Sequence, residues 1–240
     1  MKGVILAGGT GTRLLPLTKV TNKHLLPVGK KPMIYYPIER MVSAGITDII
    51  IISGTAHMGD IFQLLGSGRD FGCNFTYRVQ DESDGIGGAL RLCKNFVGDD
   101  SCLTVLGDNI FEFSLAEQVS LYESEKKSGC VLFMKSVSDP HRYGVASLDD
   151  NGKLLKIIEK PEITDSNLCV TGIYIYDSSV FDLIEHIKPS ARGELEVTDI
   201  NNRYIEMGKA SFCVLTGEWT DAGTWDSYKH ANNIFYGSDQ

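Results

Sequence analysis

The chain has 240 residues, of which 42% are hydrophobic and 22% are charged, so it can bury a full core without disulfide bonds or a structural metal. Twenty-three basic and 31 acidic residues give a formal net charge of −8, which argues against a nucleic-acid polymer as a partner, because duplex binding needs a basic face. The composition also excludes a disordered, collagen-like or coiled-coil chain.

The apolar runs and the cysteines indicate the compartment. The longest apolar runs, such as 49–52, are far shorter than the roughly 18 residues that a membrane span needs, so we expect no membrane contact. The six cysteines are scattered, without a Cys-x-x-Cys pair and without a histidine at metal-ligand spacing. We therefore expect buried free thiols in a cytoplasmic protein, not disulfides or a zinc site.

In the first half of the chain, short β-branched runs alternate with helical patterns, which predicts βαβ units around a largely parallel sheet. The expected strands, in chain order, cover 3–6, 49–52, 75–79, 103–106 and 130–135. Apolar residues at helical spacing predict helices near 33–42, 60–65 and 86–93. Ser114, followed three residues later by Glu117, forms a capping-box pattern and predicts a further helix that reaches about Lys127.

The second half combines a hairpin with helices. Segments 145–148 and 154–159 flank Asn151-Gly152, and an Asn-Gly pair is a strong hairpin signal. Further strands are expected at 168–176 and 211–215, and helices near 178–187, 198–207 and 224–234. With no linker or internal repeat, the chain is expected to form a single α/β domain, residues 1–240: a Rossmann-like mixed, mostly parallel sheet flanked by helices, with a small hairpin-containing part.

A glycine-rich segment follows the first strand. Gly8, Gly9 and Gly11 lie within four residues, so their backbone N–H groups can approach an anion closely at the carboxyl end of a strand. The segment lacks the Gly-Lys-Ser/Thr of a P-loop, and Leu14 stands where a dinucleotide fingerprint has its last glycine. From these residues alone, phosphate binding and an ordinary glycine-rich turn both stay open.

Several motifs occur together between residue 3 and about residue 227. They are Leu6-Ala7-Gly8-Gly9-Thr10-Gly11-Thr12-Arg13-Leu14, Asn22-Lys23-His24-Leu25-Leu26-Pro27-Val28, Gln80 with Asp84-Gly85, Leu106-Gly107-Asp108-Asn109, Arg142-Tyr143-Gly144-Val145, Ile158-Glu159-Lys160-Pro161, Val170-Thr171-Gly172-Ile173-Tyr174 and Trp219-Thr220-Asp221-Ala222-Gly223-Thr224. In this order they resemble the signature of the sugar-1-phosphate nucleotidylyltransferases. The chain resembles the short form of that family, because it ends at Gln240 without the helical extension of the long form.

The resemblance implies an enzyme that transfers a thymidylyl group from dTTP to glucose 1-phosphate and releases pyrophosphate, with Mg²⁺ as its cofactor. Two alternatives stay open: a transferase that uses UTP and makes UDP-glucose or another nucleotide sugar, and a nucleotide-sugar sensor without turnover. A homo-oligomer is expected. Within the single domain, about 1–135 would form a nucleotide-binding half, and about 136–240, with the hairpin, a sugar-binding half.

The resemblance also implies roles for individual residues. Catalysis is expected from Arg13, Lys23 and Asp108. Nucleotide binding is expected from Leu6, Gly8, Gly9, Gly11, Thr12, Arg13, Gln80, Gly85 and Asp108. Sugar phosphate binding is expected from Lys23, Asn109, Tyr143, Gly144, Glu159, Lys160, Val170 and Thr171. The metal is expected at Asp108 and Asp221, since Mg²⁺ favours one or two carboxylates together with substrate phosphates.

From the residues alone, these roles have structural alternatives. The two catalytic cations could be solvated surface residues, Asp108 could cap the end of a strand, and Asp221 could be an N-cap or Asx-turn residue. Tyr143 could be a packing aromatic, and Trp219 could cover the substrate or belong to the core. All four charged residues of the expected catalytic and metal set are nevertheless present, which favours an enzyme over a sensor.

Base recognition is the least defined part of the expected site. The amide of Gln80 offers one acceptor and one donor to a pyrimidine, and because an amide can flip it fits thymine, uracil or cytosine. The family often has Gly-Leu-Ala-Gln-Ala in the next motif, whereas this chain has Gly85-Ile86-Gly87-Gly88-Ala89. The second glutamine is therefore absent, and the contacts of this segment stay open.

Overall fold

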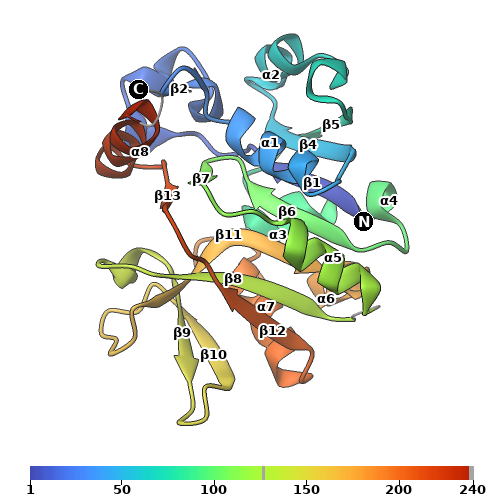
Figure 1. Cartoon of the computed structure of the whole chain (residues 1–240), viewed down its shortest axis with the longest axis vertical. Helices are drawn as coiled ribbons and strands as arrows, with labels where there is room; N and C mark the ends of the chain where they lie inside the picture. The colour runs from blue at the N-terminus through green and yellow to red at the C-terminus, as the bar shows by residue number, and fades with distance from the viewer. Residues whose placement is uncertain (126–127, 238–240) are drawn as a thin grey trace.

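The computed structural model describes residues 1–125 and 128–237, in which one mixed sheet forms the centre of the molecule (Figure 1). Its parallel part contains, in spatial order, β5 (Asn74–Gln80), β4 (Asp48–Gly54), β1 (Lys2–Leu6) and β6 (Cys102–Leu106). The first strand of the chain therefore lies inside, with later strands added on both sides of it. This is the order of a doubly wound fold, in which the direction of winding reverses between β1 and β6.

The other part of the sheet is mainly antiparallel. β11 (Leu168–Tyr176) pairs with β6, with β8 (Cys130–Ser136) and, at its start, with β9 (Gly144–Leu148). β12 (Ala210–Val214) adds to β8 in parallel. β10 (Leu154–Glu159) forms a hairpin with β9, which confirms the prediction from the Asn-Gly pair.

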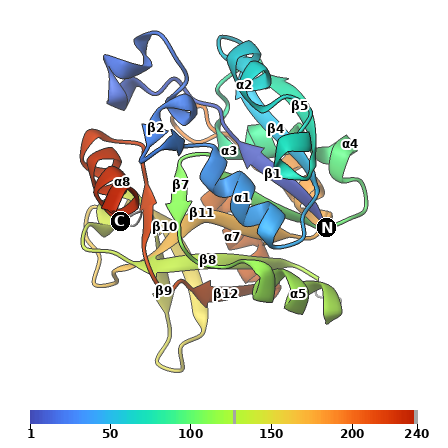
Figure 2. The same cartoon turned by 45° about the horizontal axis from the view of Figure 1, so that its top comes forward.

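Helices cover both faces of the sheet, which gives three layers (Figures 1 and 2). One face carries α1 (Tyr35–Ser43), α2 (Met58–Leu65) and α5 (Ala116–Ser124), and the other carries α3 (Gly85–Arg91), α6 (Ser179–Glu185) and α7 (Val197–Glu206). Along β1, Val4 packs on the α3 side and Ile5 on the α1 side, so both faces of the strand are apolar, as expected for a covered parallel sheet. The predicted fold class is confirmed.

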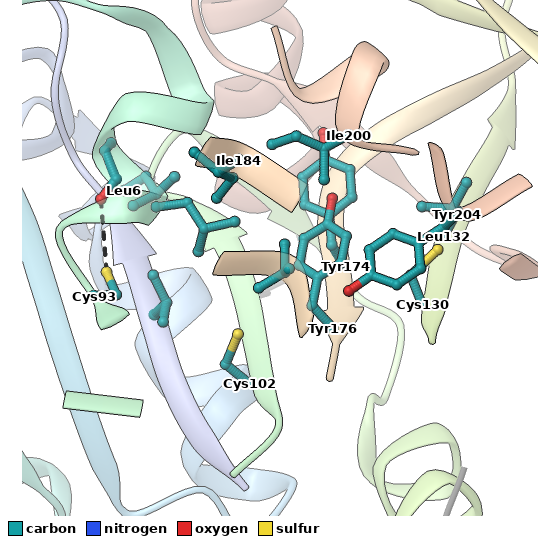
Figure 3. Close-up of a cluster of buried hydrophobic side chains, with 14 of the residues drawn as sticks. Leu6, Cys93, Cys102, Cys130, Leu132, Tyr174, Tyr176, Ile184, Ile200 and Tyr204 are labelled. Carbon is teal, nitrogen blue, oxygen red and sulfur yellow. Dashed lines mark hydrogen bonds between the residues drawn. The ribbon is translucent and has the colours of Figure 1, made fainter. Parts of the chain in front are cut away.

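The core on the α3 side contains a stack of tyrosines beside buried thiols (Figure 3). The rings of Tyr174 and Tyr176 are 5.6 Å apart, and those of Tyr176 and Tyr204 are 5.8 Å apart. The hydroxyl of Tyr176 donates to Asn201 and that of Tyr204 to Asp177, so these two hydroxyl groups have partners. All six cysteines are free, as predicted; five of them are buried as predicted, and Cys213 is partly exposed.

Short elements that the sequence prediction lacks connect the layers. β7 (Asn109–Phe111) pairs with β13 (Trp219–Asp221), and β2 (Pro27–Val28) pairs with β3 (Lys31–Pro32). The long final helix α8 (Trp225–Gly237) lies against the β2–β3 pair, where the hydroxyl of Tyr228 donates to the carbonyl of Pro27. α4 (Lys94–Val97) follows α3 after a break. Strands of two or three residues show no hydrophobic period, which is why sequence patterning misses them.

The helix after Ser114 begins later than the capping box predicts. α5 starts at Ala116, and Leu115, which is fully buried, occupies the N-cap position. The hydroxyl of Ser114 only accepts a 3.4 Å hydrogen bond from the Ala116 N–H. The prediction of Ser114 as the N-cap is therefore wrong, because burial of Leu115 sets where the helix enters the core. The predicted end near Lys127 lies outside the described residues.

A membrane span needs a helix that is both long and strongly apolar. None of the helices in the described part of the chain meets both conditions.

Candidate active site

The residues expected to bind nucleotide gather at the carboxyl ends of the parallel strands. The glycine-rich segment follows β1, Gln80 ends β5, and Asp108 comes two residues after the end of β6. The ends of these strands are level, since Leu6 pairs with Leu106 and with Ile52. Because the winding reverses between β1 and β6, the loops after these strands diverge and leave a crevice, where open α/β sheets bind their ligands.

A cavity of about 310 Å³ occupies this crevice. Of the residues expected to bind nucleotide, it is lined by Leu6, Gly8, Gly9, Arg13, Gln80, Gly85 and Asp108. Gly11 and Thr12 do not line it. Gly11 has a φ of 64° and lies against Thr18, and Thr12 begins the short 3₁₀ turn that presents Arg13, so these two residues shape the segment instead of facing the cavity.

A second cavity of about 170 Å³ lies toward the antiparallel strands. It is lined by the residues expected at the sugar phosphate, namely Asn109, Tyr143, Gly144, Glu159, Lys160, Val170 and Thr171, and by both expected metal ligands, Asp108 and Asp221. Lys23 is the exception, since it lines the first cavity.

The two cavities adjoin. Arg13, Ile86, Leu106 and Asp108 line both of them. A molecule bound in the first cavity would therefore lie next to a molecule bound in the second, with the Arg13 guanidinium and the Asp108 carboxylate beside both. Such a geometry suits a transfer between two bound substrates.

Asp108 is held in its ionised form. Its side chain lies mostly buried, 2.5 Å from the Nζ of Lys23, and it also accepts a hydrogen bond from the side chain of Asn109. Burial alone would raise the pKa of this carboxyl, but the charge of Lys23 holds the pKa well below its usual range. No hydrogen bond or ion pair joins Arg13 to another residue in the described ranges, so its guanidinium can serve an incoming anion.

Asn22 and His24, which sequence reasoning left without a role, position Lys23. The side chain of Asn22 accepts from the His24 backbone N–H and lies 2.6 Å from the His24 Nδ1, and it donates to the carbonyl of Ala7 at the end of β1. Burial, helped by the charge of Lys23, lowers the pKa of His24 to about 3. His24 is therefore neutral at physiological pH and braces the loop; the only available signal was its place in the Asn22-Lys23-His24 motif.

Asp221 reaches the site through the β7–β13 pairing, which places it opposite Asn109. The Nη2 of Arg142 lies 3.1 and 3.0 Å from its two carboxylate oxygens, and the hydroxyl of Tyr143 donates to it at 2.8 Å. Burial and the nearby charge of Asp108 raise the pKa of Asp221. Arg142 also lines the second cavity, and sequence reasoning gave it no role although it opens the Arg142-Tyr143-Gly144-Val145 motif.

The donor chemistry of Asp108 and Asp221 fits Mg²⁺. The described residues contain no group of three or more His, Cys, Asp or Glu side chains that could hold a metal by themselves. Two carboxylates facing one cavity match an ion that completes its coordination with phosphates and water. Each carboxylate is paired with a cation, Lys23 or Arg142, so a bound ion would share these oxygens with them.

The end of β10 forms the far wall of the second cavity. Glu159 accepts a 2.6 Å hydrogen bond from Thr198 through Oε2 and is paired with Lys160 through Oε1. Lys160 has a φ of 42° and is the one residue other than glycine with a positive φ in the described part of the chain. Strain of this kind persists where the surroundings fix the backbone, and here the Lys160 N–H donates to the carbonyl of Tyr143.

Asn109 connects three other residues that line the second cavity. It is almost fully buried, and its side-chain oxygen accepts from the Trp219 indole N–H and from the Gly172 N–H, each at 2.9 Å. Its amide nitrogen donates to Asp108. Trp219 is 7% exposed and packs edge-on against Tyr143, so it belongs to the core and lines the cavity at once.

Comparison with known proteins agrees with this geometry. The Nucleotidyl transferase family profile matches residues 2–236. A glucose-1-phosphate thymidylyltransferase of Xanthomonas campestris pv. campestris (strain B100) is 46% identical over 97% of this chain and 80% of the relative. One of Neisseria meningitidis serogroup A / serotype 4A is 42% identical over 96% of this chain and 81% of the relative.

Solved structures show the same similarity. A Bacillus anthracis protein in complex with sucrose, provisionally assigned as a glucose-1-phosphate thymidylyltransferase, superposes with a TM-score of 0.94 at 52% identity, covering 99% of this chain and 96% of that chain. A UDP-glucose pyrophosphorylase in complex with UDP-glucose superposes with a TM-score of 0.86 at 26% identity, covering 99% and 98%.

Proposed function

Because this chain belongs to the nucleotidyl transferase family, we propose that it is a glucose-1-phosphate thymidylyltransferase, an enzyme that makes dTDP-glucose and pyrophosphate from dTTP and glucose 1-phosphate. The observation that carries the proposal is the pair of adjoining cavities that share Arg13 and Asp108. The larger cavity, with the glycine-rich segment and Gln80, would hold dTTP. The smaller one, with Glu159 and Lys160, would hold the sugar phosphate.

In the reaction, a phosphate oxygen of glucose 1-phosphate attacks the α-phosphorus of dTTP, and the bond from that phosphorus to the β-phosphate oxygen breaks. Negative charge must be neutralised on the attacking group and on the departing pyrophosphate. The guanidinium of Arg13, which has no ion pair with any described residue, lies where the cavities meet and can hold oxygens of the triphosphate. Lys23, directed by Asp108, supplies a second positive charge to the reacting phosphates.

Mg²⁺ is part of the proposal. Asp108 and Asp221 would hold it, and the bound ion would orient the α-phosphate and offset the charge that develops there. Arg142 keeps Asp221 turned toward the cavity, and Asn109 does the same for Asp108.

The metal assignment predicts the effect of removing each charge. Asp108→Asn and Asp221→Asn should fold normally and lose about 10²-fold or more in kcat, the scale of one lost electrostatic contact in the transition state. Asp150→Asn, which removes a charge from an exposed turn, serves as the control. Circular dichroism reports folding, and pyrophosphate release over a Mg²⁺ titration reports activity. Near-normal turnover of either variant at saturating Mg²⁺ would remove that residue from the metal site.

On the sugar side, Glu159 would accept hydrogen bonds from two sugar hydroxyls and Lys160 would hold the phosphate. Gly144 lies close to this pair, because a Cβ there would lie 3.0 Å from Ile157, 3.3 Å from Thr198 and 3.5 Å from Glu159, so a side chain would crowd the sugar-binding groups. The backbone at Val170 and Thr171 would complete this wall, since the Thr171 hydroxyl is already used by the carbonyl of Phe133.

We assign nucleotide binding mainly to residues 1–135 and sugar binding mainly to residues 136–240. A few residues of each half line the other half's cavity: Glu194 lines the larger cavity, and Arg13 and Ile86 line the smaller one. We also place the enzyme in the cytoplasm, where six free thiols stay reduced.

A matrix of triphosphates and sugar 1-phosphates tests the proposed function. Pyrophosphate release in the presence of Mg²⁺ should give the highest kcat/KM for dTTP with glucose 1-phosphate, a lower value for UTP, and values near zero for CTP and purine triphosphates. A higher kcat/KM for UTP would favour a UDP-glucose pyrophosphorylase, an activity carried by one of the similar structures. Binding of dTTP without any pyrophosphate release would favour a sensor.

A further inference from the structure

Gln80, at the end of β5, has only one orientation of its side-chain amide that suits its neighbours. Its Nε2 donates to the Oδ1 of Asp84 at 2.7 Å and to the carbonyl of Gly85 at 3.3 Å. Both partners are acceptors, so a flipped amide would direct its oxygen at a carboxylate and a carbonyl. The Oε1 therefore lies on the opposite side, at 2.9 Å from the position a Cβ would take at Gly8, and Gly8 and Gln80 both line the larger cavity.

Asp84 is free to hold Gln80 because it does not cap the helix that follows it. It stands at the N-cap position of α3, yet its side chain makes no capping hydrogen bond. The carbonyl of Leu195 accepts from the Gly87 N–H, one of the groups that an N-cap aspartate commonly serves, while the Leu195 N–H donates to the Asp84 carbonyl. The carboxylate points to Gln80 with Oδ1 and accepts from Arg91 with Oδ2 at 3.0 Å.

Gly88 makes the space for this carboxylate. A Cβ at Gly88 would lie 2.0 to 2.3 Å from the Oδ1, the Cγ and the Oδ2 of Asp84, so any side chain there would displace the carboxylate. The Gly-Ile-Gly-Gly-Ala sequence departs from the Gly-Leu-Ala-Gln-Ala pattern of the resembled family at positions 86, 87 and 88, and at position 88 glycine stands in place of glutamine. The glycine at position 88 thus makes possible the contact between Asp84 and Gln80, in a local arrangement that also includes Arg91.

We propose that Asp84 is a positioning residue that selects the base: by holding the Nε2 of Gln80, it leaves only the Oε1 acceptor for the nucleotide. An acceptor fits the N3–H of thymine or uracil. The N3 of cytosine carries a lone pair and would face the Oε1 without a proton between them. Asp84 does not line the cavity, so it acts through Gln80 and does not touch the base. This inference rests on the proposed function, since it takes a pyrimidine triphosphate as the substrate.

Two variants release Gln80 by different routes. In Asp84→Asn, the new amide can donate as well as accept, so either orientation of the Gln80 amide finds a partner. In Gly88→Ala, the added Cβ displaces the Asp84 carboxylate without removing its charge from the chain. Each should lower the ratio of kcat/KM for dTTP to kcat/KM for CTP by about tenfold or more, the cost of one mismatched hydrogen bond in a buried site. The KM for glucose 1-phosphate should change by less than about twofold in either variant.

The matched control is Asp81→Asn, which removes one charge from an exposed position in the same loop and should keep the ratio, since within the described part of the chain no side-chain hydrogen bond joins Asp81 to Gln80. A double variant shows whether Asp84 works through Gln80: in the Gln80→Leu background, Asp84→Asn should no longer change the ratio. If Asp84→Asn keeps the wild-type ratio while folding and using dTTP, or changes it equally in the Gln80→Leu background, the inference is overturned and the proposed function is untouched. If the wild-type protein forms no dTDP-glucose at all, the proposed function itself has failed.

Discussion

At the scale of single residues, two cations share one site but differ in their electrostatic surroundings. Lys23 is already neutralised by Asp108, whereas the Arg13 guanidinium has no such partner among the described residues. An unpaired guanidinium gains most from an incoming triphosphate, and a paired lysine must share its charge. The two residues should therefore contribute unequally to the same reaction.

Removal of each cation should lower kcat, because both charges act on groups whose charge changes during transfer. We expect a loss of about 10²-fold for Lys23→Ala and a larger loss for Arg13→Ala. Lys19→Ala, at an exposed position in the neighbouring turn, is the control. Steady-state rates of pyrophosphate release separate kcat from KM. If both variants changed only KM, the two cations would bind ground state and transition state alike, and their catalytic role would be wrong.

The buried His24 links the loop of Lys23 to pH. Its pKa in the folded protein is lowered from 6.5 to about 3, so between these values the unfolded chain binds a proton at this side chain that the folded chain does not bind. The free energy of unfolding should therefore fall as the pH falls through this window, with a contribution from His24 of up to about 1.4 kcal/mol per pH unit. At pH values above 6.5 this contribution should be constant.

Denaturant unfolding of the wild type and of His24→Gln at pH 6, 5 and 4 measures this contribution. Glutamine can still donate toward Asn22 but cannot take up the proton. The variant should be less stable than the wild type at pH 6, and its stability should fall less steeply toward pH 4. Equal slopes for the two proteins would show that His24 is protonated in the folded state.

At the scale of elements, β11 carries the site across two parts of the sheet. It pairs with β6 along Ile173–Tyr176 and with β8 on its other side, and its register with β8 is irregular between Val170 and Tyr174. Gly172 lies in this irregular stretch and donates its N–H to Asn109. The irregularity lets the strand turn its backbone toward the cavity, where Asn109 connects it to Asp108 and Trp219.

Gly172→Ala should damage the fold and the site together. The added Cβ would lie 2.6 Å from the Asn109 amide nitrogen and from the Leu106 Cγ, so these side chains would have to move. We expect a loss of about 1–3 kcal/mol in the free energy of unfolding and a higher KM for glucose 1-phosphate. Gly54→Ala, at the end of β4 where nothing lies within 4 Å of the new Cβ, should be neutral in both measurements. An unchanged KM for Gly172→Ala would show that the contact with Asn109 does not shape the sugar cavity.

At the scale of the whole molecule, the sheet and its two helical layers bury most of the cysteine thiols. Five cysteines are buried and only Cys213, on β12, is partly exposed. Burial raises the pKa of the Cys73 thiol to about 11 and that of Cys102 to about 12, so thiolates are rare in the folded state at neutral pH.

The folded protein should therefore react with a thiol reagent at one position at most on the time scale of minutes. Titration with 5,5′-dithiobis(2-nitrobenzoic acid) should find about one thiol in the native protein and all six after denaturation. Cys213→Ser should abolish the native reaction and leave five thiols in the denatured state. Rapid reaction of three or more native thiols would contradict the packing of the two layers.

Much of this architecture could be predicted from local patterns. Continuous apolar strands, helical spacing and the Asn-Gly pair predict the layers and the hairpin. They do so because the spacing of apolar residues along an element shows whether one or both of its faces are buried. The ordered motifs likewise predict which residues belong to a common site, and the two cavities include most of them. The capping box at Ser114 failed because a fully buried neighbour, Leu115, decides where the helix begins.

What only the tertiary structure decided is how distant segments meet. The β7–β13 pairing brings Asp221 beside Asp108. The Leu195 carbonyl accepts the Gly87 N–H that Asp84 would otherwise cap. Thr198 on α7 donates to Glu159 on β10 and orients it. None of these contacts has a local period, because each depends on strand order, register and the path of a loop. The sequence by itself determined the elements and the chemical groups available to them. The packing of those elements determined which carboxylate meets which cation, and which face of the Gln80 amide is left for the base.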